Sequence, residues 1–305
     1  MRLCNGDLIR NIRKDMKLTQ EAMAEELGIS ARQLSRIENG ESDIELWQFM
    51  SIMEQIGQPV EDYWLLYLGT KEYEEYRTFR FLKRLTSDRK YTEAMEVLRR
   101  FEAGLLSKQP FIMQFVAIAK VKADKDISDK DAITAMLEVI RMTKPKFDES
   151  KVAEYRLTSN EIAALIELAS RYFSTGCEEK AISLAESIIE SRHNIHASEE
   201  DRASLLPALM SNLSTMLGRV GRYEESLRYC NMAKDISTMY SDYRLLPLLL
   251  FNSASCQYHL GEEKHVYRTE LIRAFHCANA MGQYETAKTI KENAKLSLGV
   301  TIKST

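Results

Sequence analysis

The sequence has little that would mark a secreted, membrane-spanning or disulfide-bonded protein. Its cysteines are odd in number and scattered, and none forms a Cys-x-x-Cys pair, so we expect free thiols in a reducing compartment. No run of about 18 apolar residues occurs, and the N-terminus lacks the apolar core of a signal peptide. These absences predict a cytoplasmic protein with no membrane segment. The five cysteines are Cys4, Cys177, Cys230, Cys256 and Cys277.

Motifs for catalysis and metal binding are also missing. We find no Gly-rich phosphate loop, no nucleophile elbow and no His-Glu-x-x-His. His193 and His196 form a His-x-x-His, and Cys256 with His259 forms a Cys-x-x-His, but neither pair comes with the remaining ligands of a zinc site. We therefore expect no enzyme activity, no metal and no cofactor.

Charge is nearly balanced, with 42 Lys and Arg against 45 Asp and Glu among 305 residues. This balance argues against a broadly basic nucleic-acid coat protein, but it allows a local DNA-reading face. Proline is rare, and helical periods run through the chain without strand-like alternation. The sequence therefore predicts an all-α protein, and its length allows a small domain followed by a repeat array.

The stretch from Leu18 to Gly40 is typical of two short helices joined by a tight turn. Thr19 and Ser30 can each cap a helix, and Gly28 lies between them, where the chain must leave the first helix. Apolar residues at helical spacing predict the buried faces, namely Met23, Ala24, Leu27, Leu34 and Ile37. A unit of this kind places its second helix in a DNA major groove.

The sequences LTQEAMAEELGIS and LSRIENGE resemble the lambda-repressor-like, XRE-type DNA-binding domain, and the match extends from Gly6 to Ile56. The resemblance implies that Gln20 contacts a DNA phosphate and that the third helix faces the groove. Arg can bond guanine bidentately and Gln can bond adenine, but spacing alone does not separate base contacts from phosphate contacts. The predicted DNA-binding residues are Gln20, Ser30, Ala31, Arg32, Gln33, Ser35 and Arg36.

The same resemblance implies an ion pair between Arg13 of the first helix and Glu38 of the third. We expect this pair to be structural rather than a phosphate contact. Residues 1–40 contain seven Lys and Arg against six Asp and Glu, so the domain lacks a basic footprint. A single domain should therefore bind DNA modestly, and tight binding should require a dimer.

Two further helices are predicted before the chain changes character. Residues 45–56 carry apolar side chains at helical spacing, and residues 61–68 contain Trp64 as an apolar anchor. Gly69 and Thr70 then mark a boundary. We predict a DNA-binding domain over residues 1–69 and a second domain over residues 70–305.

The second domain resembles an array of tetratricopeptide-like helix pairs. The sequence GRYEESLRYCNMAKDI from Gly221 has an acidic start, a small residue and then aliphatics, and similar stretches begin at Arg89, Cys177 and Gly282. Their spacing is about 40 to 45 residues rather than 34, so the repeats are degenerate. We predict pairs at 71–104, 109–143, 158–193, 203–239 and 243–281, and a terminal helix at 283–297. Stacked pairs form an α-solenoid with a concave surface, and the alternative is a non-repeat helical bundle.

Asn212 and Asn252 each lie nine residues before a glycine, and Glu167 has the same phase. In tetratricopeptide arrays this position faces the groove, where an amide can donate to and accept from a peptide backbone. The alternative for the two asparagines is a hydrogen bond between helices. The remaining predicted peptide-binding residues are Arg171, Met216, Arg219 and Tyr258.

The whole chain resembles the RRNPP family of peptide-pheromone regulators of Gram-positive bacteria, the Rgg-, PlcR- and PrgX-like proteins. The resemblance implies a cytoplasmic quorum-sensing transcription regulator, a homodimer on a palindromic operator that a short signalling peptide controls from the repeat groove. Two alternatives remain. The array can dock a protein partner instead of a peptide, or the chain can be an enzyme with a DNA-binding domain, which no motif supports. The peptide, the operator and the sign of regulation stay open.

Overall fold

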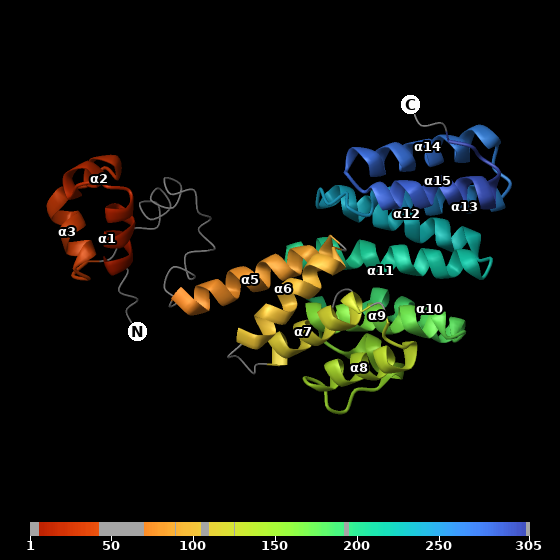
Figure 1. The fold of residues 1–305 in the computed structure, drawn as a ribbon, viewed down its shortest axis with the longest axis horizontal. Helices are drawn as coiled ribbons and strands as arrows, with labels where there is room; N and C mark the ends of the chain where they lie inside the picture. The colour runs from red at the N-terminus through yellow and green to blue at the C-terminus, as the bar shows by residue number, and fades with distance from the viewer. Residues whose placement is uncertain are drawn as a thin grey trace. The chain divides into compact units, whose positions relative to one another are not determined.

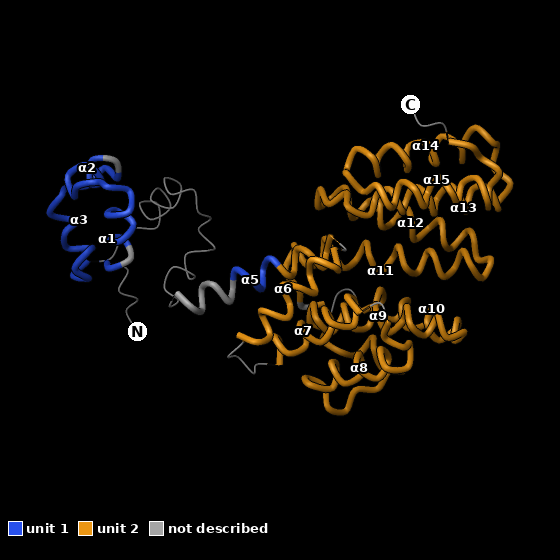
Figure 2. The backbone as a smooth tube through the Cα atoms, viewed as in Figure 1, with its two compact units in different colours: residues 1–81 blue, residues 82–305 orange. Residues whose placement is uncertain are grey.

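The structure is a computed structural model that describes residues 6–42, 70–88, 90–104, 110–124, 126–191 and 195–302. The chain divides into two compact units, residues 1–81 and residues 82–305 (Figure 2). The helices predicted at 45–56 and 61–68 lie outside the described residues. For the same reason, the domain boundary placed after residue 69 stays a prediction.

The N-terminal unit has three short described helices (Figure 1). They are α1 (Gly6–Asp15), α2 (Gln20–Glu26) and α3 (Ala31–Glu38). Both predicted caps are present, because Thr19 Oγ1 accepts from the Ala22 N–H at 3.1 Å and Ser30 Oγ accepts from the Gln33 N–H at 3.1 Å. Each cap satisfies a backbone donor that has no partner within its helix.

One apolar core holds these three helices together. A Cβ at Gly6 would lie 2.4 Å from the Ile37 carbonyl oxygen, so only glycine lets the start of α1 approach the end of α3 this closely. The apolar stripes predicted from the sequence are buried in this core, which contains Ile9, Ile12, Met23, Ala24, Leu27, Leu34 and Ile37. The exposed faces of α2 and α3 are therefore left for other contacts.

The second unit is an all-α stack of antiparallel helix pairs (Figure 1). Its helices are α5 (Thr70–Ser87, which crosses the division between the units), α6 (Tyr91–Gly104), α7 (Pro110–Ala123), α8 (Asp129–Arg141), α9 (Ser159–Ser174), α10 (Glu178–Glu190), α11 (Glu199–Arg219), α12 (Tyr223–Met239), α13 (Leu246–His259), α14 (Lys264–Ala280) and α15 (Tyr284–Leu298). Their ends fall within four residues of the five predicted pairs and the terminal helix. Gly176, Gly221 and Gly261 end α9, α11 and α13 with φ of 81° to 82°, so one turn geometry recurs through the array.

Two features of the stack were not predicted. Strand β1 (Leu157–Thr158) pairs in parallel with β2 (Ile195–His196), and the pair links the connection before α9 to the connection before α11. A 3₁₀ helix, η2 (Glu149–Glu154), precedes β1. Strands of two residues are too short to show the alternation that identifies a strand in a sequence.

The cysteines and histidines of the described residues do not gather into a metal site, since no group of three possible ligands lies together there. Cys256 Sγ donates to Ser226 Oγ at 3.0 Å, and His259 stacks on Tyr223 with ring centroids 4.4 Å apart. Burial raises the pKa of the Cys230 thiol to about 12. His193 and Cys4 lie outside the described ranges. None of the described helices has both the length and the apolar character needed to cross a bilayer.

Candidate DNA interface and ligand cavity

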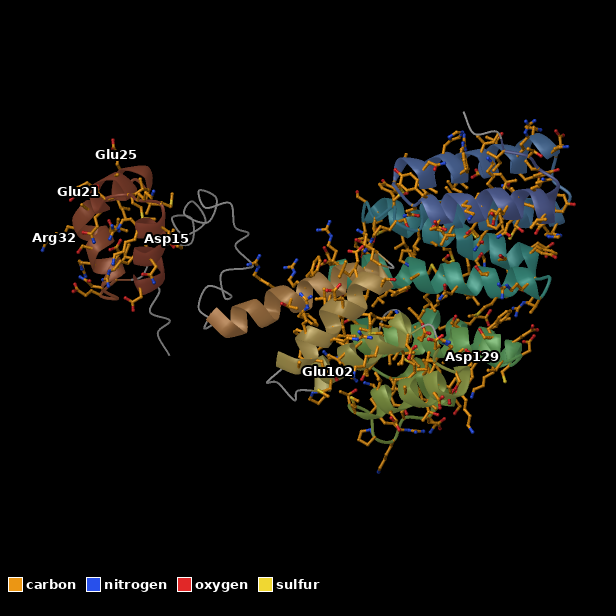
Figure 3. All side chains as sticks on the ribbon, viewed as in Figure 1. Asp15, Glu21, Glu25, Arg32, Glu102 and Asp129 are labelled. Carbon is orange, nitrogen blue, oxygen red and sulfur yellow. The ribbon has the colours of Figure 1, made fainter. Side chains whose placement is uncertain are left out.

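The predicted DNA-reading face lies on α3 and at the start of α2. Arg32, Gln33 and Arg36 are exposed on α3. Figure 3 shows Arg32 at the surface of this unit together with Glu21 and Glu25 of α2. The surface thus offers side chains that can bond base edges, but acidic side chains from α2 lie on the same unit and reduce its net positive charge.

The remaining predicted DNA-binding residues are less exposed or already engaged. Ala31 and Ser35 are half-buried on α3, and Ser30 caps that helix. Arg36 Nε lies 3.9 Å from Glu41 Oε2, and both side chains are more than half exposed, so this pair holds Arg36 only weakly. Arg36 can therefore reorient toward a base or a phosphate.

The ion pair expected between Arg13 and Glu38 is present. Arg13 Nε donates to Glu38 Oε1 at 2.6 Å, and Arg13 Nη2 donates to Oε2 at 2.9 Å. The Glu38 side chain is 0% exposed. Burial raises the pKa of Glu38, but hydrogen bonds from Arg13 and Gln20 outweigh it and hold the pKa below its ordinary value. The carboxylate is thus ionised, and it ties α1 to α3.

Gln20 joins the same network. Its Nε2 donates to Glu38 Oε2 at 2.8 Å, which fixes the amide at the first residue of α2. A side-chain amide has a second N–H, and the first backbone N–H groups of a helix also point outward. Glu38 orients the Gln20 side chain at the start of α2, and a phosphate contact by Gln20 stays a prediction.

The repeat unit contains a cavity of about 300 Å³. Its walls come from α5, α6, α7, α9, α11 and the connection between α12 and α13. Apolar side chains provide about half of the lining, including Phe115, Ile118, Ala163, Ile166, Leu205, Pro207 and Leu245. Ligand sites usually combine apolar walls with polar groups that orient the ligand, and this cavity has both.

Two of the predicted peptide-binding residues, Asn212 and Glu167, line this cavity. Asn212 is half-buried on α11. Glu167 Oε1 accepts from Arg171 Nε at 2.8 Å, and Arg171 Nη1 also donates to Asp129 Oδ1 at 3.0 Å. Asp129, labelled in Figure 3, begins α8, so Arg171 ties α9 to α8 and does not line the cavity.

Met216 and Asn252 differ from the prediction. Met216 is 5% exposed and belongs to the core, so its place on the groove surface was wrong; it lies on the side of α11 that packs inside the stack. Asn252 does not line the cavity, and its Nδ2 donates to Thr215 Oγ1 at 2.9 Å. This is the bond between helices that the sequence left as the alternative.

Arg219 and Tyr258 also lie outside the cavity lining. Arg219 is exposed, and its guanidinium lies 5.9 Å from the ring centroid of Phe173. Tyr258 packs edge-on to Tyr267, with centroids 5.3 Å apart. Both residues have local partners near the ends of their helices, which sequence phase alone does not reveal.

The sequence did not predict four charged residues that line the cavity. Lys83 of α5 and Asp201 of α11 both line it, and Lys83 Nζ lies 2.5 Å from Asp201 Oδ1. Asp242 and Arg244 line it from the connection between α12 and α13. No sequence signal could have grouped these residues, because they come from three segments far apart in the chain.

This arrangement of a helix-turn-helix unit and a helical array also occurs in known proteins. Residues 9–47 match the family described as Helix-turn-helix. No curated protein matches the chain. Bacillus thuringiensis PlcR in complex with the peptide PapR7 and DNA has a TM-score of 0.67 at 19% identity, covering 93% of this chain and 98% of that one. ComR from S. thermophilus in complex with DNA and its signalling peptide ComS has a TM-score of 0.63 at 16% identity, covering 97% and 99%. The chain therefore has the fold of these proteins, a helix-turn-helix unit followed by a helical repeat array.

A third solved structure extends the likeness. The SHP pheromone receptor Rgg2 of Streptococcus dysgalactiae has a TM-score of 0.52 at 11% identity, and the match covers 96% of this chain and 98% of that one. The architecture predicted from the sequence, a repressor-like domain before degenerate helix pairs, is thus confirmed along almost the full length of the chain.

Proposed function

We propose that this protein is a cytoplasmic transcription regulator that binds promoter DNA as a homodimer and responds to a short signalling peptide held in the repeat unit. One observation carries the proposal. The chain shares its fold, over more than nine-tenths of its length, with PlcR and ComR, whose structures hold both DNA and a signalling peptide. A quorum-sensing role follows from the same likeness, and a catalytic role has no support.

The DNA-reading part rests on α2 and α3. Arg32, Gln33 and Arg36 would reach base edges or phosphates, while Gln20 and the start of α2 would hold one phosphate. Residues 1–40 carry nearly equal numbers of acids and bases, so one unit gains little from general electrostatic attraction. Two units at the correct half-site spacing would supply the missing affinity.

The peptide part rests on the cavity of about 300 Å³. Its apolar lining can take up apolar side chains, and the Asn212 amide can donate to and accept from a peptide unit. Glu167, already bonded to Arg171, would add a negative charge at the edge of the ligand. A peptide that binds one arrangement of the repeats better than another would shift the population of the dimer competent for DNA.

Fluorescence anisotropy with DNA from beside the protein's own gene tests the proposal. The titration is run at two salt concentrations, with and without synthetic peptides encoded by small neighbouring reading frames. We expect one peptide to change the DNA affinity, Asn212→Ala to shift that change to higher peptide concentrations, and Asn231→Ala, an exposed asparagine on α12, to leave it intact. If DNA binding shows its salt dependence but no peptide alters it, the array docks a protein partner instead.

A further inference from the structure

The α5 end, which comprises residues 83–87 of the helix and the following Asp88, lies along one wall of the cavity. Lys83, Thr86 and Ser87 line it from this side. Asp201 lines it from α11, and Arg244 lines it from the connection between α12 and α13. The array therefore brings its first described helix into contact with segments more than a hundred residues later, and these contacts enclose the cavity.

The first tie across this wall is the pair between Lys83 and Asp201. Nζ and Oδ1 are 2.5 Å apart, and the side chains are 37% and 14% exposed. Asp201 lies in the first turn of α11, where Ser198 Oγ accepts from its backbone N–H at 3.1 Å. A carboxylate at this end of a helix is stabilised by the helix dipole. Removing Lys83 should therefore loosen the wall without unfolding α11.

The second tie joins Asp88 to Arg244. Asp242 accepts from Arg244 Nε at 2.9 Å and from Nη2 at 2.5 Å, while Gln283 Nε2 donates to the Arg244 carbonyl oxygen at 2.9 Å. The bonds to Asp242 orient the guanidinium, and the bond from Gln283 holds the backbone of Arg244 beside the later repeats. Its Nη1 then lies 3.6 Å from Asp88 Oδ1. Arg244 is thus the fixed partner, and Asp88 is the partner that moves with α5.

Both ties are weak enough to open. Partly exposed ion pairs each stabilise a contact only modestly, and salt screens them. The α5 end is also seated by Leu82 and Leu85, which are 0% and 3% exposed, so it has a packed position to return to. An element with one seated position and two weak charged ties can open and close reversibly.

We propose that the pairs Lys83–Asp201 and Asp88–Arg244 are a latch that holds the α5 end closed over the cavity. Ligand entry then requires the latch to open, and ligand occupancy and α5 position become coupled. The identity of the ligand as a signalling peptide rests on the proposed function, whereas the latch does not.

Hydrogen exchange on the full-length protein tests the latch without any ligand. The variants are Lys83→Glu, Asp201→Lys and the double exchange of both charges, followed at the amides of residues 82–88. We expect each single variant to exchange about fivefold faster than the wild type, and the double variant to return close to it. Lys288→Glu, an exposed lysine on α15, is the matched control and should leave these amides unchanged.

Varying the ionic strength adds a second test, because the direction of the change in exchange rate should differ between the variants. Salt weakens an attractive pair and a repulsive one alike. Added salt should speed exchange at residues 82–88 in the wild type and in the double variant, but slow it in Lys83→Glu, where the introduced carboxylate would face Asp201. Amides of α15 serve as the internal reference. If the single variants exchange like the wild type, or the double variant does no better than the singles, the pair does not hold α5. Faster exchange in the single variants together with no peptide effect on DNA affinity would support the latch and contradict the proposed function.

Discussion

Each of the two units buries a glutamate beside a candidate binding surface. The two glutamates differ in which helices supply their hydrogen-bond partners. The Glu38 side chain is 0% exposed and receives hydrogen bonds from Arg13 and Gln20, so one carboxylate joins α1, α2 and α3. Glu161 is also 0% exposed, and Lys144 Nζ lies 2.6 Å from its Oε1. The direct partners of this carboxylate come from the segment after α8 and from the start of α9, next to the cavity-lining Asn160, and Gln114 of α7 reaches the network through Thr143 Oγ1 at 2.9 Å.

The difference follows from the number of elements that share a core. Among the three described helices that pack together in the N-terminal unit, one buried polar group can reach each helix, so its loss is felt by all three. In a stacked array each helix meets mainly its neighbours, so the loss of one network stays local. Sites follow the same rule. The candidate DNA face lies on two adjacent short helices, whereas the cavity needs segments from α5 to the connection before α13.

The largest effect should come from Arg13→Ala, which leaves Glu38 buried without its main partner. We expect the N-terminal unit to lose about 3–5 kcal/mol of unfolding free energy. Lys144→Ala should cost the repeat unit less, about 1–3 kcal/mol, because Glu161 keeps its bonds from Thr143 and from the Thr158 N–H. Hydrogen exchange at α3 and α9 measures both. A larger loss in Lys144→Ala would break the comparison.

A smaller effect is expected from Arg36→Ala on the DNA face. Loss of a bidentate base contact should weaken operator binding by about 1–3 kcal/mol and relax specificity at one position. Fluorescence anisotropy with operator and scrambled DNA distinguishes these outcomes. Arg268→Ala, which removes an exposed arginine of α14, is the control. An equal loss on both DNA sequences would show that Arg36 contacts phosphate rather than a base.

Asn212→Ala and Asn252→Ala should separate the cavity from the rest of the array. We expect Asn212→Ala to weaken peptide binding by about 1 kcal/mol, the value of a typical hydrogen bond. Asn252→Ala should have a smaller effect, because that amide already bonds Thr215 and lies outside the lining. Calorimetric titration with the peptide that changes DNA affinity gives both values. A reversed order would move the peptide site toward α13.

The smallest expected effect near neutral pH is the change in unfolding free energy as the two buried glutamates approach protonation. Burial raises the pKa of both Glu38 and Glu161, but hydrogen bonds led by Arg13 and Lys144 respectively keep each pKa below its ordinary value. Each carboxylate therefore contributes stability above its unfolded-state pKa of about 4.3, and that contribution is lost as pH falls through the lower folded pKa. Urea unfolding between neutral and acidic pH measures it. We expect Glu38→Gln to flatten the acid limb of the N-terminal unit and to leave that of the repeat unit unchanged.

The sequence predicted what depends on near neighbours in the chain. Thr19 and Ser30 predicted the starts of α2 and α3, because a cap bonds backbone groups two or three residues away. The recurring glycines, Gly176, Gly221 and Gly261, predicted where the first helix of each of three pairs ends. The pairing of Arg13 with Glu38 came from a family resemblance, because 25 residues separate them in the chain. Those local signals were enough for the helix-turn-helix unit and for the order of the array.

Tertiary structure alone decided which repeat residues meet. Asn212 and Asn252 share the same sequence phase, yet one lines the cavity and the other bonds Thr215, because the stack changes what lies opposite each helix. Met216 lies in the core for the same reason. The ties from Lys83 to Asp201 and from Asp88 to Arg244 join segments more than a hundred residues apart. Helix periodicity specifies which face of each helix is apolar, but only the packing of all the helices brings distant charges to one cavity wall.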